Sequence, residues 1–148
     1  MATSIVQKIL SSNAGVAALA LRVPVGIIFA AHGAQKLFGW FGGYGLAGTG
    51  GWMDSIGLSP GIVMAFLAGA AEFFGGIALV LGLLTRPAAL ALSIAMVVAI
   101  VAVHLPNGMF MSNNGYEFGL ALLAASVSLL FSGAGKSSLD NLLAKRFN

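Results

Sequence analysis

The stretch GIVMAFLAGAAEFFGGIALVLGLL, residues 61–84, is apolar or small throughout except for Glu72 at its midpoint. At about 1.5 Å of rise per residue, a helix over this stretch is about 36 Å long, and a bilayer's hydrocarbon core is about 30 Å thick. The stretch therefore predicts a membrane-spanning helix. A carboxylate at the centre of a bilayer costs at least about 2.5 kcal/mol unless it is shielded or paired. We expect Glu72 to face protein.

The two sides of this helix differ in residue size. At 100° per residue, small residues predominate on the side of Glu72, which carries Gly61, Ala65, Ala68, Gly69, Gly75, Gly76, Leu79 and Leu83. The opposite side is bulky and carries Val63, Phe66, Leu67, Phe74, Ile77 and Leu81. Small residues let helix backbones approach closely, so the Glu72 side is expected to pack on partner helices and the bulky side to meet lipid.

The composition excludes several classes of protein. A chain of 148 residues forms one domain, and 59% hydrophobic with 7% charged residues is too apolar for a soluble globule. The net charge of +3 suits anionic lipid headgroups, and no basic stripe indicates nucleic acid. The absence of cysteine excludes disulfides, thiolate nucleophiles and iron–sulfur ligation within this chain.

Hydropathy along the chain predicts an all-α integral membrane four-helix bundle in a single membrane domain, residues 1–148. The first 13 residues are polar and the first apolar run is longer than a signal sequence, so we expect that run to be retained. A short interfacial amphipathic helix with basic anchors is expected at the C-terminus. The expected spans are 14–38, 61–84, 88–105 and 116–131, and the interfacial tail is 136–148.

Lysine and arginine are distributed asymmetrically between the loops. They occur in the N-terminal lead, in the turn at Arg86 and in the C-terminal tail, whereas the loops that begin at Gly39 and Pro106 have none. The positive-inside rule then places both termini in the cytoplasm. The loop over 39–60, rich in glycine and aromatic residues, would lie on the outer side, at headgroup level.

Polar residues within the spans form a series in depth. Their positions along the helices place Lys36, His104 and Glu117 in an outer layer, His32 about 6 Å outward of the span centre, and Glu72 at the centre. Arg22 lies inward, and Gln35 is on the same span. Such a series could carry protons to the membrane centre, or it could line a cleft for an amphipathic ligand.

Each of these residues also has a structural interpretation. Glu72 could pair with Arg22 or His32 as a tie between helices, and Arg22 could anchor the inner leaflet. Glu117 lies three residues after Asn114 and could be its capping-box partner. The Lys36 side chain could reach to the interface, and His104 could satisfy the end of its helix.

Several motifs together resemble those of the DoxX family of bacterial membrane proteins. They are Arg22 with His32-Gly33-x-x-Lys36, Ala71-Glu72-Phe73-Phe74-Gly75-Gly76, Leu81-Gly82-Leu83-Leu84-Thr85-Arg86, His104, Gly115-Tyr116-Glu117, and Gly133-x-Gly135-Lys136-x-Ser138-Leu139-Asp140. The resemblance covers about residues 17–143. It implies a four-span bundle in the bacterial cytoplasmic (inner) membrane and, for some members, quinone-linked redox work or association with thiosulfate:quinone oxidoreduction.

These observations lead us to expect the membrane subunit of a quinone-linked oxidoreductase. Glu72 and His32 are the candidate catalytic acid and base, and the candidate quinone-binding residues are Lys36, His104, Glu117, Gln35 and Arg22. A non-covalently bound quinone is the expected cofactor. No metal or haem is expected, because the two histidines differ in depth by about 5 Å and no second axial pair exists.

Two other functions remain open from the sequence. The chain could be a non-catalytic anchor that recruits a soluble redox partner, in which case the glycine–aromatic loop and the basic tail carry the function. It could also be a small transporter of protons or of a lipophilic metabolite. The expected partners are the lipid bilayer, a quinone or other lipophilic molecule, and a soluble redox subunit. The helix faces rich in glycine and alanine also permit a homodimer.

Overall fold

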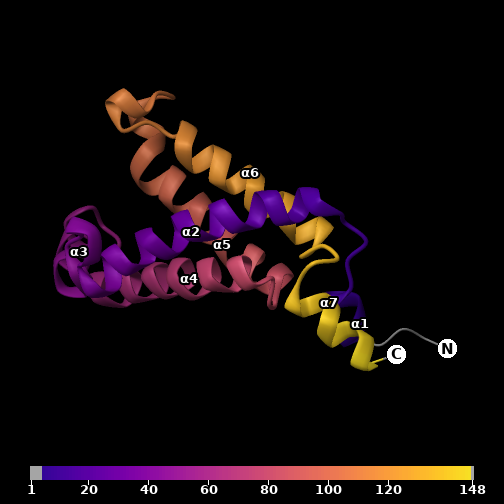
Figure 1. The fold of residues 1–148 in the computed structure, drawn as a ribbon. Helices are drawn as coiled ribbons and strands as arrows, with labels where there is room; N and C mark the ends of the chain where they lie inside the picture. The colour runs from indigo at the N-terminus through magenta and orange to yellow at the C-terminus, as the bar shows by residue number, and fades with distance from the viewer. Residues whose placement is uncertain (1–4, 148) are drawn as a thin grey trace.

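A computed structural model describes residues 5–147, and this part of the chain is helical without strands (Figure 1). The expected all-α membrane bundle is confirmed. Its α-helices are α1 (Ile5–Leu10), α2 (Val16–Phe38), α3 (Gly45–Ser55), α4 (Gly61–Leu81), α5 (Thr85–Ala99), α6 (Glu117–Ser132) and α7 (Leu139–Ala144). Short helical turns are η1 (Trp40–Gly42), η2 (Ile100–His104), η3 (Leu105–Asn107), η4 (Met111–Asn113) and η5 (Lys145–Phe147).

In the part of the chain that the structure describes, three helices are long and apolar enough to cross a bilayer. They are α2, α4 and the continuous helix Thr85–Asn107, which comprises α5, η2 and η3. Helix α6 is apolar but has only 16 residues, which makes it about 24 Å long. It is therefore shorter than a typical hydrocarbon core, and the segment before it is made of loops and short turns. The protein is a multi-pass membrane protein in contact with the lipid bilayer.

The four main helices form two antiparallel pairs, α2 with α4 and α5 with α6. Glycines bring the first pair close together: a Cβ on Gly33 would lie 2.3 Å from the backbone nitrogen of Phe73, and one on Gly76 would lie 2.4 Å from that of Ala30. Helix α3 lies beside the end of the first pair, and at this end the two pairs diverge in Figure 1. We call it the aromatic end, because it carries Trp40, Phe41, Tyr44 and Trp52.

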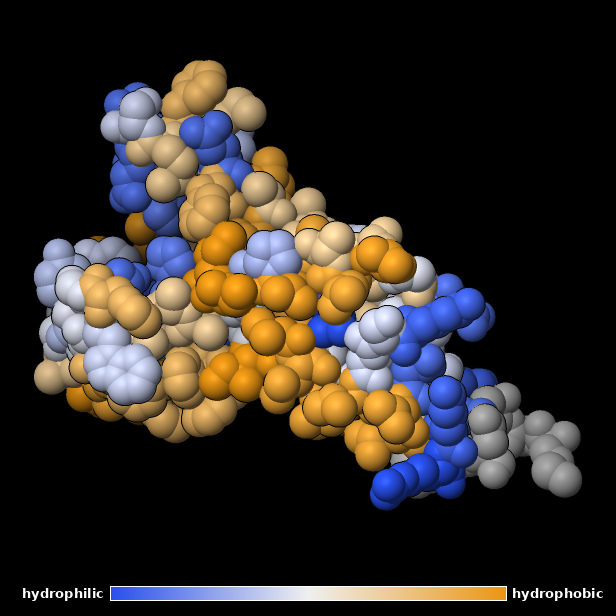
Figure 2. All heavy atoms as spheres, viewed as in Figure 1, coloured by the Kyte–Doolittle hydropathy of each residue, from blue (hydrophilic) through white to orange (hydrophobic). Residues whose placement is uncertain are grey.

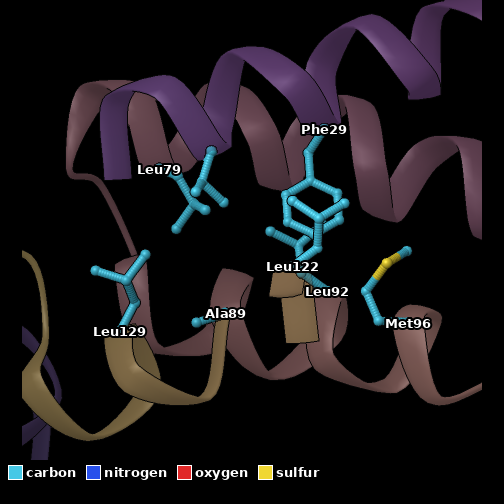
Figure 3. Close-up of a cluster of buried hydrophobic side chains, with 8 residues drawn as sticks. Phe29, Leu79, Ala89, Leu92, Met96, Leu122 and Leu129 are labelled. Atoms are coloured by element: carbon cyan, nitrogen blue, oxygen red, sulfur yellow. The ribbon is translucent and has the colours of Figure 1, made fainter. Parts of the chain in front are cut away.

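The hydrophobic core lies where the two pairs meet (Figure 3). Phe29 of α2 is 1% exposed and packs with Leu79 of α4, Leu92 of α5 and Leu122 of α6. Val25, Ala89, Met96 and Leu129 complete the buried cluster. Because lipid is as apolar as these side chains, close packing rather than exclusion from water holds this core together.

The bulky side of α4 is turned away from the protein, as the sequence predicts. Val63, Phe66, Leu67 and Phe74 are about half exposed, and a hydrophobic band runs across the middle of the molecule in Figure 2. The small side of α4 is buried together with Glu72, which is 4% exposed. The predicted division of this helix into a lipid face and a protein face is therefore confirmed.

Helices α1 and α7 lie together at the opposite end of the bundle, which we call the basic end because Arg22, Arg86, Lys136 and Lys145 gather there (Figure 1). The tail forms a shorter helix than the expected 136–148. Helix α7 begins at Leu139, because Ser138 is its N-cap and the Ser138 hydroxyl accepts from the Asn141 amide. Residues 1–4 and 148 lie outside the described part. The cytoplasmic location of the termini stays a prediction.

Candidate functional site

A cavity of about 500 Å³ lies at the aromatic end, bounded by α2, α3, α4, the α5–η2 helix, η4 and the start of α6. Phe29, Met96 and Leu122 of the buried core form part of its lining, so it rests directly on the packed centre of the bundle. The lining is mainly apolar and aromatic. Its polar members are His32, Lys36, Tyr44, Glu72, His104 and Asn114.

A charged pair lies on the wall of this cavity. The Lys36 Nζ atom donates to the Glu72 Oε2 atom over 2.6 Å, and the two side chains are 25% and 5% exposed. Glu72 is thus paired as its depth requires, but with Lys36 rather than with Arg22 or His32. The close approach of α2 to α4 makes the pair possible, because Gly33 packs on the backbone of Phe73, next to Glu72.

His32 lies on the same side of α2 as Lys36, one helical turn away. Its ring centroid is 6.0 Å from that of Phe118 on α6, so the imidazole lies between the two helix pairs. It is within electrostatic range of both Lys36 and Glu72. The structure therefore brings together the two candidate catalytic residues and Lys36 around one cavity.

His104 lines the cavity at the end of a segment where the α-helix becomes irregular. The segment Ile100–His104 is a π-helix, a form that occurs mostly as short bulges and often at functional sites. The His104 Nδ1 atom lies 2.9 Å from the carbonyl oxygen of Asn114, which can only accept. Nδ1 therefore carries a proton, and in the neutral ring Nε2 has a free lone pair.

Three of the predicted site residues do not line the cavity. The Gln35 amide nitrogen donates to the Phe41 carbonyl over 3.3 Å, which ties α2 to the loop that follows it. The Glu117 Oε1 atom accepts from the Met111 amide over 2.7 Å, so this carboxylate fastens η4 and is not paired with Asn114.

Arg22 lies at the basic end and is 2% exposed. It donates to the carbonyls of Leu79 and Val80 in the last turn of α4 and to those of Ala134 and Ser137 in the tail. Its guanidinium therefore joins the end of one helix to the C-terminal segment within the protein and is not the partner of Glu72. Its interpretation as an anchor in the inner leaflet stays a prediction.

Helix α3 contributes cavity residues that the sequence did not single out as site residues. Tyr44, which directly precedes α3, lines the cavity together with Trp52 and Met53 of α3, although the sequence suggested only an interfacial location for this stretch. A glycine lets α3 reach the cavity: a Cβ on Gly50 would lie 2.9 Å from the Ile62 Cα atom, so α3 folds tightly against the start of α4. The Asp54 Oδ1 atom holds this arrangement by accepting from the Gly61 amide over 2.8 Å.

Comparison with known proteins agrees with the motifs. Residues 17–105 match the family model described as DoxX. An uncharacterized protein of Haemophilus influenzae is 36% identical over 85% of this chain and 90% of its own length. A Bacillus subtilis protein named "Putative oxidoreductase CatD" is 35% identical over 86% of this chain and 87% of its own length.

A third relative is an uncharacterized membrane protein of Mycobacterium tuberculosis, 35% identical over 86% of this chain and 82% of its own length. No solved structure matches the chain. The family match covers more than half of the chain and includes α2 from its second residue, α4, and all four polar groups just described at the cavity wall. The chain belongs to the DoxX family.

Proposed function

We propose that this protein is the membrane subunit of a quinone-linked oxidoreductase of the bacterial inner membrane, and that the cavity at the aromatic end holds the quinone head. The observation that carries the proposal is the Lys36–Glu72 pair on the wall of an apolar, aromatic cavity of about 500 Å³. Small-molecule sites typically have volumes of about 300–1,000 Å³ and a few placed polar groups in an apolar lining.

The chemistry of the polar groups suits quinone reduction. Conversion of a quinone to a quinol takes two electrons and two protons, one proton for each carbonyl oxygen. The Lys36 ammonium would donate a hydrogen bond to one of these oxygens and stabilise the negative charge that reduction places on it. Glu72 keeps that ammonium in place and, together with His32, would pass protons to the ring as an acid–base pair.

His104 would serve the other side of the ring. Its Nδ1–H is fixed on Asn114, so a protonated His104 has Nε2–H as its free donor, and a neutral one has Nε2 as its free acceptor. The electrons come from outside the chain, either from a soluble redox partner or directly from a reduced substrate. The name of the Bacillus subtilis relative gives modest support for redox work in this family.

The test combines binding with turnover. Protein purified in mild detergent is analysed by mass spectrometry for co-purified quinones, and quinone reduction is measured in native membranes for Glu72→Gln, Lys36→Met and the control Lys8→Met. Lys8 is an exposed cation at the opposite end of the bundle and does not line the cavity. We expect quinone in the wild type, and a loss of about 100-fold in turnover for Glu72→Gln if it is a general acid–base residue.

The opposite result would favour the anchor. If no quinone co-purifies and Glu72→Gln turns over quinone as fast as the Lys8→Met control, the cavity has no redox role. The Lys36–Glu72 pair would then be a tie between α2 and α4. Recruitment of a soluble partner that survives Glu72→Ala and His32→Ala but is lost on removal of residues 136–148 would establish that alternative.

A further inference from the structure

A second, smaller groove lies at the basic end, far from the cavity. It is formed where the last residue of α4, Leu81, meets the C-terminal segment. Two cations and two hydroxyls line it together with apolar side chains: Lys136, Ser137, Ser138, Lys145, Leu139 and Leu142. Among the described residues, no carboxylate lines this groove.

The acid nearest in sequence to the groove is fully occupied elsewhere. Asp140 is 1% exposed, and its two oxygens accept from the backbone amides of Leu84 and Thr85 over 2.6 and 2.8 Å. Because both oxygens are engaged inside the protein, the carboxylate does not compete for the lysines. Lys136 and Lys145 are exposed, so their charges remain free for an anion from outside.

The groove is held in a fixed shape, unlike a flexible polybasic tail. Buried Arg22 donates to the carbonyls of Ala134 and Ser137, on either side of Lys136. The Lys136 amide donates to the Ala14 carbonyl over 3.0 Å, and the Asp140 amide donates to the Gly82 carbonyl over 2.8 Å. The backbone that carries both groove serines and Lys136 is therefore bound to two parts of the bundle.

The apolar residues of the groove place it at the membrane boundary. Leu81 is 47% exposed at the end of a bilayer-spanning helix, and Leu139 and Leu142 are 41% and 63% exposed. Figure 2 shows hydrophobic atoms directly beside strongly hydrophilic ones over the C-terminal segment. A ligand that satisfies both must carry an anionic group on an apolar body.

We propose that this groove is a binding site for one anionic phospholipid. The phosphate would lie between Lys136 and Lys145 within reach of the Ser137 hydroxyl, and an acyl chain would pass over Leu142 and Leu81 along α4. A headgroup with a net negative charge is required, because two lysines without a counter-charge favour an anion over a zwitterion. The site would fasten the tail, and through Arg22 the end of α4, to the membrane surface.

Native mass spectrometry of the full chain, released from vesicles of phosphatidylglycerol and phosphatidylcholine in equal amounts, tests the proposal. We expect the wild type to keep one phosphatidylglycerol in preference to phosphatidylcholine. We expect each of the two lysines that would contact the phosphate to be worth about fivefold in binding, so Lys136→Ala with Lys145→Ala should weaken retention about 25-fold. Leu142→Gln should also weaken it. Circular dichroism of each variant checks that it is folded.

The matched control is Arg146→Ala, which removes the same charge one residue beyond Lys145 but outside the groove. It should leave retention within about twofold of the wild type, since a rim charge outside the site adds little. Equal retention of the two lipids overturns the proposal. An equal loss of retention in Arg146→Ala and in Lys145→Ala also overturns it, because that result indicates diffuse surface charge. Displacement of the lipid by inorganic phosphate at the same concentration overturns it as well, because that result indicates a free-phosphate site.

Discussion

Arg22 and Arg86 occupy equivalent places in the two helix pairs. Arg22, on α2, donates to the carbonyls of Leu79 and Val80 in the last turn of α4, and Arg86, on α5, donates to those of Leu130 and Phe131 in the last turn of α6. Each guanidinium thus caps the C-terminal end of the helix with which its own helix is paired, where free carbonyls favour a cation.

The two glycines that follow these helix ends complete the repeated arrangement. Gly82 and Gly133 have φ values of 63° and 74°, and a Cβ on either would lie about 3 Å from the guanidinium carbon of its arginine, 2.9 Å and 3.1 Å respectively. Each arginine also binds a terminal segment of the chain, Arg22 the tail and Arg86 the N-terminal lead. The feature that the two helix pairs share is a contact between a guanidinium and a helix end, and it is not a repeated sequence motif.

Arg22→Lys should destabilise the protein strongly. Lysine keeps the charge but cannot reach four carbonyls with a planar fork, so buried acceptors lose their partners, at a cost of about 1–3 kcal/mol for each unsatisfied group. The measurement is thermal unfolding followed by circular dichroism in detergent. Lys8→Met, at an exposed site on the same end, is the control and should unfold with the wild type. An Arg22→Lys melting curve that matches the control would contradict the capping role.

The Lys36–Glu72 pair should show strong coupling in a double-mutant cycle. Lys36→Met alone leaves a buried carboxylate without its partner, and breaking such a pair costs about 3–5 kcal/mol. Lys36→Met combined with Glu72→Gln removes both charges, and the double variant should recover most of that loss. Unfolding free energies of the wild type, the two single variants and the double variant give the coupling. Additive losses would mean that the two charges do not interact.

Gly33→Ala should separate α2 from α4 and thereby break the same pair. The added Cβ would lie 2.3 Å from the backbone of Phe73, which cannot yield as a flexible side chain would. Gly51→Ala is the control: its Cβ meets nothing within 4 Å, and alanine favours a helix by about 1 kcal/mol over glycine. Thermal unfolding and quinone retention are measured for both. Gly33→Ala should unfold at a lower temperature than the wild type and should lose the bound quinone. The Gly51→Ala control should keep the stability and the quinone of the wild type.

The general plan of the bundle could be predicted from the sequence. The 3.6-residue periodicity around Glu72 gave the correct lipid and protein sides of α4, because in a membrane a buried carboxylate and a stripe of small residues leave few alternatives. The partner of Glu72 could not be predicted. It depends on the register between α2 and α4, which glycine contacts such as that of Gly33 with Phe73 determine only in three dimensions.

The predicted depth series also grouped polar residues that line the cavity with polar residues that only bond the backbone of their own loop. Position along a helix placed Glu117 and His104 in the same layer, but depth does not indicate direction around the bundle. The cavity takes in His104 through a π-helical turn, whereas Glu117 bonds the backbone of its own loop. Neither the π-helix nor the fold-back of α3 has a periodic signature that could be read from the sequence.

The fold-back of α3 should weaken in acid through Asp54. Its carboxylate accepts from the Ser59 hydroxyl over 2.7 Å and from the Gly61 amide over 2.8 Å, and these bonds lower the pKa of Asp54 below its ordinary value of 3.8. A carboxyl whose pKa is lower in the folded state contributes stability at pH values above its unfolded pKa. That contribution is lost as the pH falls through the lower, folded pKa.

The weakening of the α3 fold-back in acid can be followed by the fluorescence of Trp52, which is on the same helix. The measurement is made in a Trp40→Phe variant, in which Trp52 is the one remaining tryptophan. We expect a reversible change in emission at a pH below 3.8 in that background. Ser59→Ala removes the bond that contributes most to the lowered pKa, so the midpoint should move upward, towards the ordinary value. Asp54→Asn should abolish the transition altogether, because the amide does not titrate. A transition that persists unchanged in Asp54→Asn would assign it to another carboxyl and remove Asp54 as the residue that holds α3 to α4.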